Sequence, residues 1–106
     1  MTDPARFNRR LSLEAPVETA DGAGGVTRSF AQIARVWAEV TPLSAGETMS
    51  ADAHGARVTH RITIRAGRAV TNRHRFTEDG RAYRVIAARD SDDRRLTLIT
   101  VEEMTS

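Results

Sequence analysis

The chain has 106 residues, of which 40% are apolar, and its formal net charge is +2. This length and composition predict a single domain over residues 1–106 with one modest core. The absence of cysteine excludes a disulfide framework and a thiolate metal site. The sequence has no apolar run long enough for a transmembrane helix, and its first residues are polar. We therefore expect no membrane partner and no secretory signal.

All sixteen basic residues are arginine. Arginine keeps its charge and binds carboxylates through paired hydrogen bonds, which suits an interface that holds charged partners. Codon bias in a GC-rich genome is the simpler explanation of the same composition. Because fourteen acidic residues offset the arginines, the high isoelectric point is weak support for nucleic-acid binding.

Residues 1–8 are polar, contain a proline and are expected to form a flexible N-terminal arm. The alternating residues 9–17 predict a first strand, with Pro16 near its end, where a missing amide donor does least harm. The glycine-rich residues 21–25 then predict a flexible turn. A phosphate-binding loop would need a helix after it, and the residues that follow are short and weakly patterned.

Residues 34–41 (ARVWAEVT) alternate again and predict a second strand, which Pro42 ends. The even-numbered positions are small and aliphatic, whereas the odd-numbered ones include Trp37, the only tryptophan. We interpret Trp37 as a packing residue of the core or of the sheet-to-loop boundary. The alternative is a binding hot spot at an interface.

Residues 43–57 are expected to form a long loop, because they are small and polar with glycine near each end. A loop of this length in a small domain is more often functional than idle. Such residues cannot bury enough surface to order themselves. We expect a partner to supply the missing contacts, through Glu47 and the adaptable Met49. The alternative is a tolerated mobile excursion, because the entropy of loop closure rises slowly with length.

Residues 58–65 (VTHRITIR) alternate without a break and predict the central, half-buried strand. One face carries mostly β-branched aliphatic residues, and the other carries Arg61 and Arg65, two pleats apart. We predict that these two arginines meet acidic groups of a neighbouring protein. The alternative is a solvated sheet face, where exposed ion pairs contribute little.

Three further strands are predicted at residues 70–78, 81–89 and 94–103. Asp79 and Gly80, between the first two, are a favoured type I′ hairpin turn. About six strands, short turns and little helix indicate an all-β fold. We expect a small antiparallel β-barrel or sandwich with one long inserted loop. A closed barrel would also protect the edges of so small a sheet.

No group of side chains in the sequence predicts catalysis, a cofactor or a metal ion. His54, His60 and His74 lack metal-ligand spacing, and we interpret His60 as a packed residue of the core or its rim. The adjacent carboxylates at positions 92–93 and 102–103 point to opposite sides of a strand. Because no acid, base and nucleophile can be placed together, we expect no enzyme activity.

Five motifs, in order along the chain, resemble one family. They are Arg-x-Leu-x-Leu-Glu from position 9, Asp-Gly-x-Gly-Gly from 21, Val-Trp-Ala-Glu-Val-x-Pro from 36, Thr-His-Arg-Ile-Thr-Ile-Arg from 59 and Asp-Gly-Arg-x-Tyr-Arg-Val-Ile from 79. Over about residues 9–102 the chain resembles the head–tail joining proteins, also called head-closure or adaptor proteins, of long-tailed bacteriophages and phage-like gene transfer agents.

The resemblance implies a structural virion protein, made in the bacterial cytoplasm, without catalysis or a cofactor. Proteins of this kind assemble as a ring beneath the portal, join the DNA-filled head to the tail and surround the DNA exit channel. The implied partners are copies of the same chain, a portal or adaptor protein on the head side, and a tail terminator or tail tube protein on the tail side. DNA would pass through the channel without sequence-specific binding. In such a ring, Arg61 and Arg65 would meet acidic groups of a neighbouring subunit or ring, or face the channel.

The alternative function is a small nucleic-acid-binding β-barrel, in which aromatic side chains stack on bases. The few aromatic residues do not gather on one predicted strand, which argues against that function.

Overall fold

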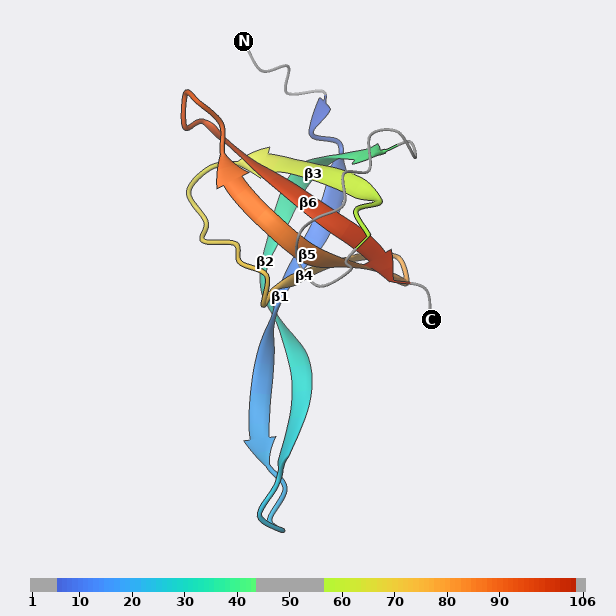
Figure 1. Cartoon of the computed structure of the whole chain (residues 1–106), viewed down its shortest axis with the longest axis vertical. Helices are drawn as coiled ribbons and strands as arrows, with labels where there is room; N and C mark the ends of the chain where they lie inside the picture. The colour runs from blue at the N-terminus through green and yellow to red at the C-terminus, as the bar shows by residue number, and fades with distance from the viewer. Residues whose placement is uncertain (1–5, 44–56, 105–106) are drawn as a thin grey trace.

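The computed structural model of the chain describes residues 6–43 and 57–104. Six strands form one closed antiparallel barrel in the order β1-β2-β3-β6-β5-β4 (Figure 1). The all-β prediction is confirmed, and closure decides for a barrel over a sandwich. No helix of the described ranges is long and apolar enough to span a membrane. The strands are β1 (Arg9–Ala20), β2 (Val26–Pro42), β3 (His60–Arg65), β4 (Arg75–Glu78), β5 (Arg81–Asp90) and β6 (Leu96–Met104).

The barrel interior holds one hydrophobic core to which all six strands contribute. Alternate residues of each strand point inward, as the two-residue period of a strand requires. Phe76 and Tyr83 are partners across the β4–β5 pair, and both are fully buried. The fully buried aliphatic side chains around them are Leu11, Leu13, Ile62, Ile64, Val85, Ile99 and Val101.

The alternating residues 58–65 contain a strand with a buried face, as their pattern predicted, and β3 begins at His60. It pairs with β2 on one side and with β6 on the other. Ile62 and Ile64 are buried in the core, and the side chain of His60 lies at its rim. There His60 meets the Tyr83 ring edge-on, with 5.3 Å between ring centroids. The expected packing role of His60 is therefore what the structure shows.

The β1–β2 hairpin is longer than the sequence predicted and extends well clear of the barrel (Figure 1). The first strand was expected to end at Val17 and the second to begin at Ala34, but pairing continues from Arg9↔Ala38 to Ala20↔Val26. Both boundaries were wrong because the outer half of the hairpin buries neither face. Without a buried face, a strand has no alternating pattern to detect.

The glycine-rich turn at the hairpin tip is confirmed. The Asp21 carboxylate accepts hydrogen bonds from the backbone N–H groups of Ala23 (2.8 Å) and Gly25 (3.0 Å). These bonds lower the pKa of the Asp21 carboxyl below its usual value. Gly22 and Gly24 have φ of 81° and 87°, a region that glycine enters without strain.

The β4–β5 turn has the predicted type I′ form, because Asp79 (φ 47°) and Gly80 (φ 83°) both adopt positive φ. The strand before it is shorter than the predicted residues 70–78. The Thr71 N–H donates to His74 Nδ1 at 2.9 Å, and the His74 N–H donates to the Thr71 carbonyl at 3.1 Å. These local hydrogen bonds make a turn, which leaves only Arg75–Glu78 as strand.

Trp37 is not a core residue, which corrects the preferred interpretation of the sequence. Its side chain is 52% exposed on the outer face of β2. The alternation of β2 points its neighbours Val36 and Ala38 into the barrel, so Trp37 must point outward. The fully buried aromatic residues of the described chain are Phe76 and Tyr83 instead.

The N-terminal segment that was assigned to an arm contacts the barrel at residues 6–8. Phe7 is 8% exposed, and the Arg65 guanidinium lies 5.8 Å from the centre of its ring. The guanidinium of Arg6 donates two hydrogen bonds of 2.7 Å to the Glu39 carboxylate on β2. The remaining residues of the expected arm lie outside the described residues.

Replacing Phe76 or Trp37 with alanine should change the free energy of unfolding by different amounts, because Phe76 lies in the core and Trp37 on the surface. Phe76→Ala removes a fully buried ring and should lower the free energy of unfolding by about 3–5 kcal/mol. Trp37→Ala should lower it by about 1 kcal/mol, because half of the ring already contacts water. Urea unfolding followed by far-ultraviolet circular dichroism measures both values. Equal losses would mean that Trp37 is a core residue after all.

Candidate interaction site

The sequence singled out four residues for contact with partners, and the structure describes two of them. Arg61 and Arg65 both lie on the exposed face of β3. Arg65 already stacks on Phe7, whereas Arg61 has only threonines, Thr41 and Thr100, as its partners on the adjacent strands. Glu47 and Met49 lie outside the described residues, as does most of the 43–57 loop. The contact role of these residues stays a prediction.

Several arginines are used inside the subunit, as cross-strand ion pairs on the outer surface. Arg75 donates to Glu14 at 2.6 Å across the β1–β4 pair. Arg84 donates to Glu102 at 2.7 Å across the β5–β6 pair. These bonds give the all-arginine composition a structural use that needs no partner.

The ion pair between Arg9 and Glu78 has the least exposed carboxylate of these three pairs. The guanidinium of Arg9 donates to both carboxylate oxygens of Glu78, one of them from Nε at 2.8 Å. Hydrogen bonding from Arg9 lowers the pKa of Glu78, although desolvation opposes the shift. The same hydrogen bond raises the pKa of Arg9 above its already high ordinary value. The pair stays ionised throughout the neutral range.

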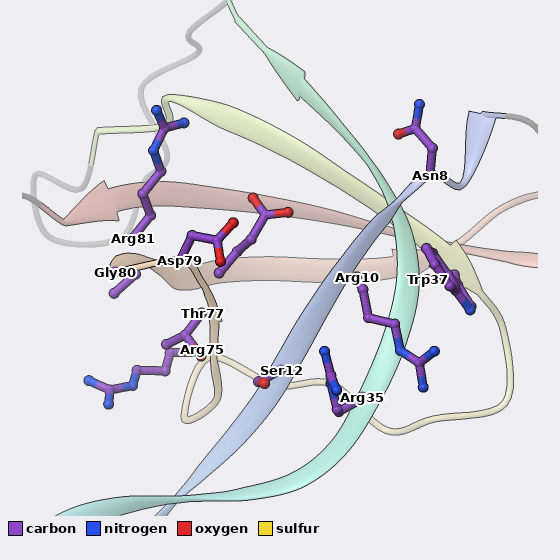
Figure 2. Close-up of a pocket in the computed structure, with 12 residues that line it drawn as sticks. Asn8, Arg10, Ser12, Arg35, Trp37, Arg75, Thr77, Asp79, Gly80 and Arg81 are labelled. Carbon is purple, nitrogen blue, oxygen red and sulfur yellow. The ribbon is translucent and has the colours of Figure 1, made fainter.

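A groove with an excess of arginine opens on the outer surface of the barrel (Figure 2). It has a volume of about 670 Å³. Arg10 from β1 and Arg35 and Trp37 from β2 lie on one side of it. The other side is formed by β4, the turn that follows it and the start of β5, with Arg75, Thr77, Asp79, Gly80 and Arg81.

Two arginines of the groove have no carboxylate partner among the described residues. The guanidinium of Arg10 lies 5.0 Å from the centre of the Trp37 ring, a cation–π arrangement, and Arg35 forms no ion pair. The Glu78 carboxylate in the groove is already bound by Arg9. The groove can therefore receive negatively charged groups, through guanidinium forks that match carboxylate or phosphate oxygens.

Sequence reasoning missed the groove because its residues come from four strands, β1, β2, β4 and β5. The signal available in the sequence was the alternation of inward and outward side chains along β2. Once Val36 and Ala38 are assigned to the core, Arg35 and Trp37 must share the outer face. The register then places Arg10 beside Trp37 and Ser12 beside Arg35. That register depends on barrel pairing, which one sequence does not supply.

The hairpin is the second exposed feature. Val17, Val26, Phe30 and Ile33 on it are 40–57% exposed. The Arg75 guanidinium lies 4.0 Å from the centre of the Phe30 ring and also pairs with Glu14, so one residue of β4 supports the base of the hairpin. A two-stranded hairpin is at best marginally stable alone in water. Its exposed apolar side chains mark a surface for another molecule.

The arrangement of the outer surface suits binding to other molecules. Among the described residues, no three His, Asp, Glu or Cys side chains gather as a metal site. The features present are a small closed barrel, a basic groove with an aromatic wall and a projecting hairpin. Together they form an outer surface that is suited to contact with other macromolecules.

The chain belongs to the phage head completion protein family, whose model matches residues 2–104. It is similar to a chain in the virion of a native gene transfer agent particle. That similarity has a TM-score of 0.72 and 29% sequence identity, and covers 95% of this chain and 98% of the other. The suspected family is thus confirmed.

A second solved structure shares the fold. It is the solution structure of protein SF1141 from Shigella flexneri 2a, with a TM-score of 0.78, 23% identity and 99% coverage of both chains. A comparison with curated proteins gave no match.

The Arg9–Glu78 pair predicts an acid-sensitive contribution to stability. The pKa of Glu78 is lowered from 4.5 in the folded state. Its contribution is therefore complete above pH 4.5 and is lost as the pH falls through the lowered folded value. Glu78→Gln should destabilise the protein at neutral pH, and the difference from the unmodified chain should shrink in acid. Urea unfolding across this pH range measures it. A difference that is constant with pH would contradict this assignment, and Glu18→Gln at an exposed pair is the control.

Proposed function

We propose that this protein is a connector subunit at the head–tail junction of a phage or phage-like particle. The observation that carries the proposal is the family match over residues 2–104. The likeness to a chain of a gene transfer agent virion, over nearly the full length of both chains, supports it. In this role the subunit forms a ring beneath the portal, joins the DNA-filled head to the tail and surrounds the DNA exit channel.

The proposed partners follow from that position. Copies of the chain form the ring, a portal or adaptor protein contacts it on the head side, and a tail terminator or tail tube protein contacts it on the tail side. DNA passes through without sequence-specific binding. The subunit is made in the bacterial cytoplasm and acts in the particle without enzymatic activity.

The outer surface of the barrel offers contacts suited to such neighbours. The groove with Arg10, Arg35 and Trp37 fits acidic side chains of an adjoining protein, because its guanidinium groups are not neutralised within the subunit. Arg61 and Arg65 extend the positive surface over β3. Glu47 and Met49 of the 43–57 loop complete the proposed interface.

A nucleic-acid-binding barrel is the alternative, and one observation favours it. Trp37 and Phe30 are both exposed on β2, and each has an arginine guanidinium against its ring. Exposed aromatic side chains with cationic side chains from other strands can bind single-stranded nucleic acid by stacking. Against it, fourteen acidic residues nearly balance the positive charge of the chain.

Loss of the protein should leave DNA-filled heads without attached tails. A connector is needed after the head is filled, so packaging proceeds and joining fails. Electron microscopy of particles from cells that lack the protein, with complementation by the unmodified chain, measures the outcome. Normal tailed particles would contradict the proposed function, and so would empty heads only.

The groove should act in joining and not in folding. The double variant Arg10→Gln/Arg35→Gln should keep the circular dichroism spectrum of the unmodified protein, because neither residue forms an ion pair in the subunit. It should lower the yield of tailed particles by about tenfold, the effect of roughly 1.4 kcal/mol at an interface. Arg89→Gln, on the exposed surface of β5, is the matched control.

The same variants distinguish the connector function from the alternative of nucleic-acid binding. We expect the isolated protein to bind neither single-stranded nor duplex DNA detectably at physiological salt, as measured by fluorescence anisotropy. An affinity that falls steeply with salt, and that the groove variant loses, would favour nucleic-acid binding.

A further inference from the structure

One edge of β2 has no neighbouring strand over most of its length. β2 pairs with β1 from Val26 to Ala38, but in the described chain it pairs with β3 only from Ala38 to Pro42. Residues 26–37 therefore present a free edge on that side. A free edge of this length is a template for another strand unless something covers it.

Exposed apolar side chains concentrate on the same stretch. Of the six large apolar side chains that are exposed in the described residues, four lie between positions 26 and 37. They are Val26, Phe30, Ile33 and Trp37. A cleft of about 470 Å³ also opens beside this edge, between Arg35–Trp37 and the turn at residues 65–68. An edge with these properties has both the space and the apolar surface to receive a strand.

The other strand of the hairpin has a free edge of its own. β1 pairs with β4 only from Ser12 to Glu14, so residues 15–20 have no strand beyond them in the part of the chain that is described. The turn at residues 71–74 lies beside Ala15 and Pro16, and the edge is open beyond them, from Val17 to Ala20. The two free edges lie on opposite sides of one antiparallel hairpin. When two copies stand side by side with their hairpins pointing the same way, β2 of one runs antiparallel to β1 of the next. This is the geometry of an ordinary antiparallel sheet.

The charges on the two edges are complementary. Arg28 on β2 and Glu18 on β1 are register partners, with 3.3 Å between Nε and Oε1. Both side chains are largely exposed, at 76% and 48%. Because they lie at the same height on opposite edges, parallel copies bring Arg28 of one beside Glu18 of the next. Opposite charges on adjacent strands favour pairing.

We propose that the free edge of β2 pairs with the free edge of β1 in a second copy of the chain. Repeated from copy to copy, this contact joins the hairpins into one continuous antiparallel sheet. The inference rests on the proposed ring assembly. A head-to-tail contact of this kind closes on itself under cyclic symmetry and leaves no hairpin edge exposed.

Disulfide trapping tests the contact directly, because the chain contains no cysteine of its own. Two single variants, Glu18→Cys and Arg28→Cys, are given different tags and expressed together in cells that produce the particle. A disulfide between the two tags can form only between copies. We expect this mixed cross-link in purified particles, and none with Arg89→Cys in place of Arg28→Cys.

The pattern of cross-links decides between arrangements. A shift of the hairpins by one pleat would move the cross-link from Glu18→Cys to Ala20→Cys and would still support the proposal. A cross-link of Arg28→Cys with itself would indicate two-fold pairing of β2 edges and would overturn it. Particles that contain the protein and hold tails, but give no hairpin cross-link at either position, would also overturn it while the proposed function stands. Absence of the protein from particles would instead refute the proposed function.

A proline on the edge provides a second test. Pro16 has no N–H, so Pro16 and Phe30 form a non-hydrogen-bonded pair of the hairpin. Hydrogen-bonded and non-hydrogen-bonded pairs alternate along antiparallel strands, so Glu18 and Arg28 also form a non-hydrogen-bonded pair. The amide of Arg28 therefore points away from β1, to the free edge. Arg28→Pro removes this donor without removing a bond of the hairpin, and Arg28→Ala is the matched control that keeps it. We expect both to fold and Arg28→Pro alone to lose tailed particles. Equal yields from the two variants would contradict the proposal.

Discussion

Closure of the barrel depends on a short seam between β1 and β4. The two strands meet over three register pairs, from Ser12↔Thr77 to Glu14↔Arg75. On the inner face of this seam, Leu13 and Phe76 are register partners, and both are buried in the core. Outside it, the Arg75–Glu14 ion pair spans the same strands. Apolar packing on one face and charge on the other compensate for so few backbone hydrogen bonds.

The seam also sets where the hairpin begins. β1 leaves β4 after Glu14 and continues with β2 alone, so the element that closes the barrel also projects from it. The register shift between Leu13 and Glu14, opposite Ile33 on β2, lies at this point. A bulge increases the local twist and redirects the strands. Barrel and hairpin are therefore one continuous pair of strands, and a partner that holds the hairpin acts directly on the closing strand.

Arginine has two physical roles in this chain. Where an acidic side chain lies within reach, as Glu78 does for Arg9, the two form an ion pair that supports the barrel, and the arginine charge is neutralised within the subunit. Where none does, as at Arg10 and Arg35, the guanidinium remains available to another molecule. This division places the unneutralised positive charge in a groove beside an exposed tryptophan. It is consistent with a protein of the phage head completion family, whose function is assembly.

The sequence by itself determined the fold class, the central strand and the tight turns. Alternation over residues 58–65 and the Asp79–Gly80 turn signal are local properties of the sequence. They can therefore be recognised without knowing which other segments surround them. The family resemblance rested on the same local motifs. Only the tertiary structure decided which face of β2 is covered and how far the β1–β2 hairpin extends. Trp37 is exposed because the barrel interior takes Val36 and Ala38, and the outer hairpin shows no pattern because nothing in the described subunit covers it. Burial is a relation between distant segments, and one sequence does not fix it until the strands are paired.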